Sequence, residues 1–301
     1  MMTTITTTTI AGTSTTVTTL PPVATASFTV PVGVNGVTYD EGPYPSGPSS
    51  FVVVADGGVV ITDTAAVRDA TPRLLRFDAS GNAEEPIPMQ DYRAVSMIDI
   101  ASDGLRLAVL DIYVALDEYR VLVLDASGSL ESQIDIPEGF HLENGLTGLL
   151  WDDQGLLLEI EGGTRYARLE PDRNPEPTTT LIIDGVAVTL TDAGQVTTVQ
   201  IDEDAFEVTR STQFGDVGLI GLAPDGSVLL HLDEVFDDPA GLRVERRVQR
   251  YSTDGELLRE VSVDLAEQYV QIVHQLEMTA DGAVAHMVSL PDRVEVRILD
   301  L

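Results

Sequence analysis

The feature that most constrains the fold of this chain is a unit of short apolar segments joined by tight glycine turns. In its clearest copy, residues 51–54 are apolar, Asp56-Gly57 follows, and a second apolar segment ends at Asp63. A third segment runs over residues 73–78 and turns at Gly81. An Asp-Gly pair between apolar segments is the strongest short-range signal for a β-hairpin, because the tight turn needs a positive φ. The unit therefore predicts four antiparallel strands.

The same order of strands and turns returns along the chain. Further tight turns are found at Asp103-Gly104, Ser127-Gly128, Asp225-Gly226, Asp254-Gly255 and Asp281-Gly282. A four-stranded antiparallel unit that recurs about every 40 to 50 residues is typical of the blades of a β-propeller. Long segments with helical periodicity are lacking, so we predict an all-β chain. A β-sandwich is the alternative, but it would not repeat the same turn chemistry at the same place in each unit.

The number of blades depends on residues 146–213, which contain too many strands for one blade. We divide them into one blade over residues 146–177 and another over residues 178–214, which gives six blades. Five blades with an inserted hairpin are the alternative. The last unit lacks its fourth strand, and the strand-like segment 26–32 has no other partner. We therefore expect an N-terminal strand to close the ring and cover two exposed edges.

The first residues have a different composition. Eleven of the first twenty are Thr, and no charged residue precedes Asp40. Such a segment has little to bury and is typical of an extended stalk outside the cell. We expect residues 1–25 to be a Thr-rich disordered stalk and residues 26–301 to form the propeller. Because of this stalk-like composition, we predict an extracellular or cell-surface protein. No signal-peptide pattern is present, so we expect its signal or anchor to lie outside this sequence.

Charge and composition exclude several classes of protein. The chain has 49 acidic residues against 17 basic ones, all of them Arg, and a formal charge of −32. This charge argues against nucleic acid or an anionic membrane as a partner, because both require clustered cations. The chain has no cysteine, which excludes disulfides, thiol catalysis and thiolate metal sites. No apolar segment reaches the roughly 20 residues of a membrane-spanning helix.

The repeat resembles that of the NHL family and its six-bladed propeller relatives. The resemblance is carried by Gly47-Pro48, Asp56-Gly57, Ile61-Thr62-Asp63, residues 73–78 and Gly81. The resemblance implies the propeller fold. It does not imply one activity, because NHL-type propellers serve as binding platforms, lyases, lactonases and sensor domains. Gluconolactonase-like propellers hold a divalent metal with Glu, Asn and Asp. The few asparagines here provide no convincing counterpart: Asn35, Asn82, Asn144 and Asn174.

Candidate catalytic and metal-binding residues are sparse. The histidines are His141, His231, His274 and His286, and no pair has the spacing of a helical zinc site. His231 and His286 occupy similar positions in the second strands of their blades. We expect both to be ordinary strand residues; the alternative is a pair near the channel that acts as a base or as metal ligands.

The pattern of acidic residues indicates structural roles more than catalytic or metal-binding ones. Residues 202–204 and 237–238 could hold Ca²⁺ through oxygen ligands, but no EF-hand loop is present and we expect solvated turn acids, without a metal or other cofactor. The acids at strand ends are each followed by an arginine across the loop. We predict structural ion pairs between Asp63 and Arg73, Asp111 and Arg120, and Asp233 and Arg250.

The order of strands also predicts a binding face. The tight turns share one face of the propeller, so the longer second-to-third and blade-to-blade loops lie on the other face, where recognition concentrates. We predict a non-catalytic extracellular binding or scaffold propeller that recognises a protein or carbohydrate through this long-loop face. The alternative is a metal-dependent hydrolase or lactonase with its site in the central channel. The predicted binding residues are Tyr113, Asp117, Glu118, Tyr119, Phe140, Phe236, Asp237, Asp238 and Tyr269.

Overall fold

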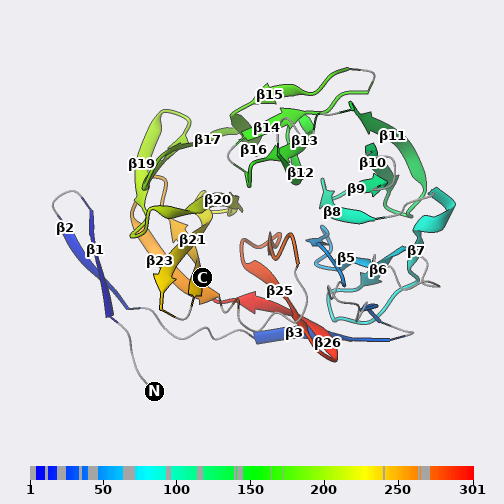
Figure 1. The fold of residues 1–301 in the computed structure, drawn as a ribbon, viewed down its shortest axis with the longest axis horizontal. Coiled ribbons are helices and arrows are strands. Elements are labelled where there is room, and N and C mark those ends of the chain that lie inside the picture. Colours follow the sequence, from blue (N-terminus) through cyan, green and yellow to red (C-terminus); the bar gives the residue numbers. More distant parts are fainter. Residues whose placement is uncertain are drawn as a thin grey trace.

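Six four-stranded antiparallel sheets form a ring in the computed structural model of the chain (Figure 1). The predicted six-bladed β-propeller is confirmed, and the five-bladed alternative is excluded. The structure describes residues 5–10, 13–18, 25–33, 36–39, 47–63, 72–92, 96–113, 118–138, 140, 145–163, 165–171, 173–239, 241–263, 265 and 272–301.

Each blade is named here from its innermost strand outward. The first three blades consist of β4 (Phe51–Val53), β5 (Val59–Asp63), β6 (Arg73–Phe77) and β7 (Ile87–Pro88); β8 (Met97–Ser102), β9 (Arg106–Tyr113), β10 (Glu118–Asp125) and β11 (Leu130–Ile136); and β12 (Leu146–Asp152), β13 (Gly155–Ile160), β14 (Arg165–Arg168) and β15 (Glu176–Thr178). A short 3-10 helix, η1 (Met89–Tyr92), links the first blade to the second.

The other three blades complete the ring. They consist of β16 (Thr180–Ile183), β17 (Val186–Ala193), β18 (Val196–Ile201) and β19 (Asp204–Thr209); β20 (Phe214–Leu222), β21 (Val228–Asp238), β22 (Gly241–Tyr251) and β23 (Leu257–Val263); and β24 (Leu276–Met278), β25 (Val284–Leu290), β26 (Arg293–Leu299) and β3 (Thr25–Pro31). The predicted division of residues 146–214 into two blades is therefore confirmed.

The ring is closed by the N-terminal strand, as predicted. Strand β3 pairs antiparallel with β26, and Val30 lies opposite Val294. Both side chains are fully buried, and Phe28 packs against the same hydrophobic cluster. The first segment of the propeller thus supplies the outermost strand of the last blade, which joins the two ends of the chain through a shared sheet.

Part of the predicted stalk forms two strands. Strands β1 (Ile5–Ile10) and β2 (Thr13–Thr18) pair antiparallel in a sheet of their own. Strand β3 begins at Thr25, which agrees with a propeller that starts near residue 26. The division into a disordered stalk and a propeller stays a prediction.

The hydrophobic core lies mainly between neighbouring blades. Val52 and Leu74 of the first blade pack in one cluster with Ile100 and Leu107 of the second. The second blade in turn packs its other face against the third, where Val121 shares a cluster with residues of β13. Because the side chains of a strand alternate between the two faces of its sheet, every blade can bury both faces. The inner strands are thereby held at fixed positions around the centre.

Ion pairs between the second and third strands recur in the blades. Arg73 Nε lies 2.8 Å from Asp63 Oδ2, and Arg120 Nη2 lies 2.9 Å from Asp111 Oδ2, as predicted. The predicted pair of Asp233 with Arg250 is wrong, because Asp233 pairs with Arg246 at 2.6 Å. The hairpin β21–β22 is longer than expected, and its register sets Arg246 directly opposite Asp233. Arg250 instead pairs with Asp225.

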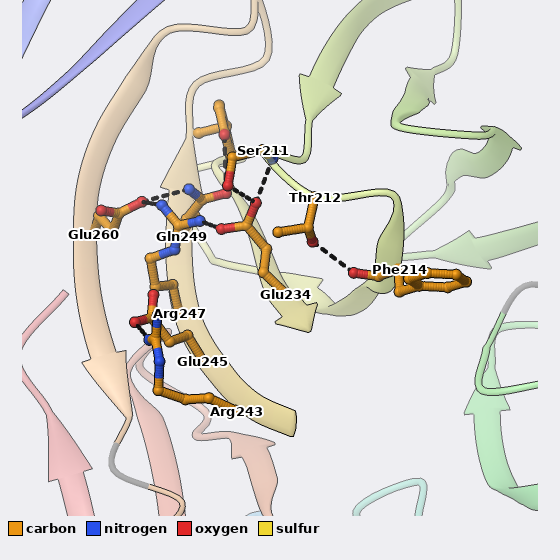
Figure 2. A network of polar contacts seen from close by, with 10 residues as sticks. Ser211, Thr212, Phe214, Glu234, Arg243, Glu245, Arg247, Gln249 and Glu260 are labelled. Atoms are coloured by element: carbon orange, nitrogen blue, oxygen red, sulfur yellow. Dashed lines mark hydrogen bonds and ion pairs between the residues drawn. The ribbon is translucent and has the colours of Figure 1, made fainter. Parts of the chain in front are cut away.

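The sequence predicts one of the long second-to-third loops over residues 234–244, and this hairpin corrects that expectation. Strands β21 and β22 continue through almost all of it, because buried polar contacts as well as backbone pairing support their outer ends. Figure 2 shows that Glu234, which is 1% exposed, accepts hydrogen bonds from Ser211 and pairs with Arg247. Gln249 donates to Glu260 at 2.5 Å in the same network. A buried carboxylate satisfied in this way favours order.

Candidate active site

The innermost strands of the blades border the central channel, and they bring polar residues of different blades together. Around the ring, β24 lies beside β4, β4 beside β8, and β8 beside β12. Ser50 immediately precedes β4, Asp99 lies within β8, and His274 precedes β24. All three are near the starts of their strands. These strand starts follow the connections between blades and so lie at the long-loop end of the ring.

Asp99 ties three blades together. Its side chain is fully buried. One carboxylate oxygen accepts a hydrogen bond from Ser50 Oγ at 2.5 Å, and the other accepts one from the backbone N–H of Leu149 at 2.7 Å. A β-bulge in the pairing of β8 with β9 lies between Met97 and Asp99. Bulges often redirect a side chain beside a functional site, and here the bulge precedes a buried acid with partners in both neighbouring blades.

His274 lies between two acids. Its Nδ1 is 3.7 Å from Asp99 Oδ1, and its Nε2 is 3.3 Å from Glu277 Oε1. Burial alone would lower the pKa of the imidazole, but Asp99, Glu277 and Glu159 outweigh that effect and raise it to about 10. His274 is therefore an imidazolium at neutral pH, held between Asp99 of the second blade and Glu277 of its own.

Two glutamates in the cluster have pKa values above the ordinary value of a glutamate. Burial raises the pKa of Glu277 to about 7, with His274 opposing the rise and Asp99 and Glu159 adding to it. Burial also raises the pKa of Glu159, which accepts a hydrogen bond from Thr147 Oγ1 at 2.9 Å. A carboxyl group with a pKa near 7 can both accept and donate a proton at neutral pH, as a general base requires.

Two glycines on inner strands let side chains of second strands reach inward. Gly148 of β12 lies opposite Glu159, and Gly218 of β20 lies opposite His231. A Cβ at Gly218 would lie 2.0 Å from His231 Nε2, and one at Gly148 would lie 3.7 Å from Glu159 Oε1 and 2.6 Å from Asp99. The side chains of Glu159 and His231 thus lie over the innermost strand.

His231 and His286 have similar chemistry but different surroundings. Burial lowers the pKa of each to about 4, so both are neutral at pH 7. His231 interacts with Asp233, at 3.9 Å, and with His274. His286 is 3% exposed and its pKa responds to Arg297 and Arg246. Of the two histidines singled out from the sequence, only His231 is thus coupled to His274.

Several predicted binding residues are partly engaged in the fold. Tyr119 and Phe140 are half-buried and pack against a core cluster. Phe236 is half-buried, with the Arg243 guanidinium 4.5 Å from its ring centroid. Glu118 is exposed at the start of β10. These placements do not bring the residues together at one site.

The remaining predicted binding residues lie at strand ends or outside the described part. Asp237 is exposed and Asp238 is half-buried at the end of β21. Tyr113 ends β9, but its side chain, like Asp117 and Tyr269, is outside the described residues. The binding role of the whole set stays a prediction.

The geometry of the cluster does not favour a metal centre. Within the described residues, no group of three or more His, Asp or Glu side chains is placed to hold a metal ion. In the same part of the chain, no helix has the length and apolar character needed to cross a membrane.

No family model matches the chain, and no curated protein matches it. Among solved structures, it is similar to a "putative 6-phosphogluconolactonase" from Bacteroides uniformis, at 14% identity over 85% of both chains and a TM-score of 0.43. A protein from Bacteroides fragilis with the same description gives 14% identity, coverage of 86% and 87%, and a TM-score of 0.45. The β-propeller domain of the Trilobed protease from Pyrococcus furiosus is similar at 12% identity and a TM-score of 0.44. The match covers 92% of this chain and 94% of that domain.

The structure corrects the prediction of a non-catalytic binding or scaffold propeller. The cluster of Asp99, Glu159, His274 and Glu277 is a coherent acid–base set, which a non-catalytic propeller does not require. Two of the similar structures are described as lactonases, and that likeness concerns the fold alone. The alternative, a hydrolase or lactonase, therefore replaces the non-catalytic hypothesis.

The sequence contained a signal for these residues. Asp99 and Glu159 are single acids within strands that are otherwise mainly apolar. Asp99 is buried, and Glu159 is half-buried between two buried neighbours. Gly148 interrupts the apolar inner strand directly opposite Glu159. A lone acid in an apolar strand with glycine as its cross-strand partner is a more selective pattern than the number of acids in a loop.

Proposed function

We propose that this protein hydrolyses a lactone or another ester at the channel end formed by β8, β13 and β24. The observation that carries the proposal is the placement of the His274 imidazolium between the carboxyl groups of Asp99 and Glu277. The description of two similar folds as lactonases agrees with it. The cluster offers a base of suitable pKa beside a fixed positive charge, and ester hydrolysis needs both.

In the proposed reaction Glu277, as the carboxylate, takes a proton from a water molecule. The water oxygen attacks the carbonyl carbon, and the electron pair of the C=O bond moves to its oxygen. The His274 imidazolium stabilises the resulting oxyanion, because it remains charged up to a pH of about 10. When the oxyanion collapses, the bond to the ring or alcohol oxygen breaks, and the protonated Glu277 returns a proton to that oxygen.

Asp99 acts as a positioning residue. It touches the imidazole on the side away from Glu277, and its carboxylate is itself fixed by Ser50 and the backbone of Leu149. A charged group oriented before the reaction needs no reorganisation when the oxyanion develops. Asp99 thereby holds the proton on His274 and fixes the direction of the ring.

The test is a screen of purified protein on aliphatic lactones, δ-gluconolactone and p-nitrophenyl esters. Glu277→Gln and His274→Gln should each lower kcat/KM about 100-fold or more, the usual scale for a lost base or oxyanion donor. His286→Gln is the matched histidine control and should keep wild-type turnover. Melting curves establish that each variant folds. Turnover that survives both Glu277→Gln and His274→Gln would contradict the proposal, as would no turnover on any ester class.

Two finer assignments are also proposals. We propose that the repeats are NHL-like, which the recurrent pairs of a strand-end acid with an arginine of the next strand support. We further propose an extracellular or cell-surface location, for which the Thr-rich composition before residue 20 is the support.

A further inference from the structure

Every arginine that the structure describes is already paired with an acid. The pairs within or between blades include the buried or half-buried arginines Arg73, Arg120, Arg168, Arg210, Arg246, Arg247, Arg250 and Arg297. The more exposed arginines are paired as well, namely Arg76, Arg106, Arg165, Arg173, Arg243, Arg259 and Arg293. The chain contains no lysine. Cationic side chains for a ligand are therefore scarce.

Arg246, which influences His231, and Arg210, which influences Asp216, already have acidic partners. Arg246 donates to both carboxylate oxygens of Asp233, at 2.7 and 2.6 Å, and to Gln275 Oε1 at 3.0 Å. Arg210 is 3% exposed and donates to Asp192 and to the backbone oxygen of Gly215. Turning either guanidinium toward a ligand would break these contacts, which for Arg246 include both carboxylate oxygens of the half-buried Asp233.

The site itself has a surplus of acids. Asp99, Glu159 and Glu277 surround the single imidazolium of His274. Asp216 of β20 adds a fourth acid. A Cβ at Gly162 would lie 3.3 Å from Asp216 Oδ2, and one at the next residue, Gly163, would lie 3.8 Å from the Glu159 carboxylate. Asp216 also raises the pKa of Glu159. By sequence alone, the segments outside the described residues contribute only Arg68 and Arg93 as cations, and they contain more acids than that. The acids of the cluster would repel an anionic ligand, and no bidentate pair of arginine N–H donors among the described residues is available to offset that repulsion.

We infer that the channel accepts an uncharged lactone or ester and discriminates against the same molecule when it carries a phosphate. This inference rests on the proposed hydrolysis and adds the charge of its substrate. A phosphate dianion would lose its hydration at the channel, and among the described residues it would find no arginine without an acidic partner. The charge of His274 already faces Asp99 and Glu277, and in the proposed reaction it serves the carbonyl oxygen. The phosphorylated lactone named for the similar folds is thus a poor fit for this chain.

A matched pair of substrates tests the inference. δ-Gluconolactone and 6-phospho-δ-gluconolactone share the reacting ring and differ in one phosphate, and both rates are corrected for spontaneous hydrolysis. We expect kcat/KM for the uncharged lactone to exceed that for the phosphorylated one by about 100-fold, mainly through KM, with the ratio shrinking as NaCl screens the repulsion. A phosphorylated lactone turned over equally well or better would overturn the inference while leaving the proposed hydrolysis intact. Turnover of neither lactone nor of any other ester overturns both.

One variant connects the discrimination to the channel acids. Asp216→Asn removes an acid beside Glu159 that has no role in the proposed proton transfers. It should raise relative turnover of the phosphorylated lactone several-fold. Asp204→Asn, an exposed acid on β19, changes the net charge equally and should leave the ratio unchanged. Equal effects of the two variants would assign the discrimination to the overall charge of the protein and contradict a channel origin.

Discussion

At the scale of single residues, the proposed hydrolysis depends on two raised pKa values. Burial raises the pKa of Glu277, whereas neighbouring acids raise the pKa of His274 against the effect of burial. Glu277 must be ionised to act as a base, so turnover should rise as the pH passes about 7. His274 must stay protonated, so turnover should fall as the pH passes about 10. We predict a bell-shaped dependence of kcat/KM on pH with a plateau between these values, measured on whichever ester gives turnover.

The high-pH limb has a specific origin that can be tested. Asp99 is the largest of the influences that raise the pKa of His274. Asp99→Asn should therefore move the descending limb to lower pH and leave the ascending limb, which reports Glu277, less affected. A merely structural role for Asp99 would lower turnover at all pH values without moving the limb.

Single residues were also where the sequence was least informative. Asp99, Glu159 and His274 are far apart in the chain, and only the ring brings the second, third and sixth blades to the same point. A pKa depends on distance and desolvation, which a sequence does not contain. The loop aromatics are predicted to bind because loops carry function. Tyr119 and Phe140 also pack partly against a core cluster, and their binding role stays a prediction.

At the scale of elements, the closing strand β3 should be essential for stability. Val30 is fully buried against β26, whereas the neighbouring Thr29 is exposed. Val30→Asn places an unpaired amide in the core and should cost about 3 kcal/mol or more. Thr29→Asn should change the free energy of unfolding by less than about 0.5 kcal/mol. Denaturant unfolding measures both, and equal stability of the two variants would contradict closure by this strand.

The elements were largely predictable because turns are local. The glycines of the tight turns require positive φ values, as at Gly57 and Gly226, so the sequence marks where each hairpin reverses. The division of residues 146–214 and the closing strand followed from counting strands. The length of the β21–β22 hairpin did not, since its outer end depends on Glu234 and Arg247 in a buried network that joins it to the preceding segment. Pairing of this kind is not visible in strand periodicity.

At the scale of the whole molecule, the formal charge of −32 sets the response to salt. Acids outnumber arginines by far, so the folded surface repels itself, and salt shortens the range of that repulsion from about 10 Å at 0.1 M to about 3 Å at 1 M. We predict that the Tm rises between these NaCl concentrations, as measured by calorimetry. The paired arginines work in the opposite direction, because screening weakens exposed ion pairs, but such pairs contribute little individually. A Tm that falls or stays constant would contradict this balance.

The proposed site requires that the ring hold a histidine that stays charged to about pH 10 beside Asp99, Glu159 and Glu277. Titration of the histidines by ¹⁵N NMR tests this without any substrate. His274 should keep both ring nitrogens protonated from neutral pH up to about 10, and its signal should vanish in His274→Gln. His231 and His286 should remain neutral down to a pH of about 4. Titration of all histidines near the ordinary value of about 6.5 would contradict the cluster and the function built on it.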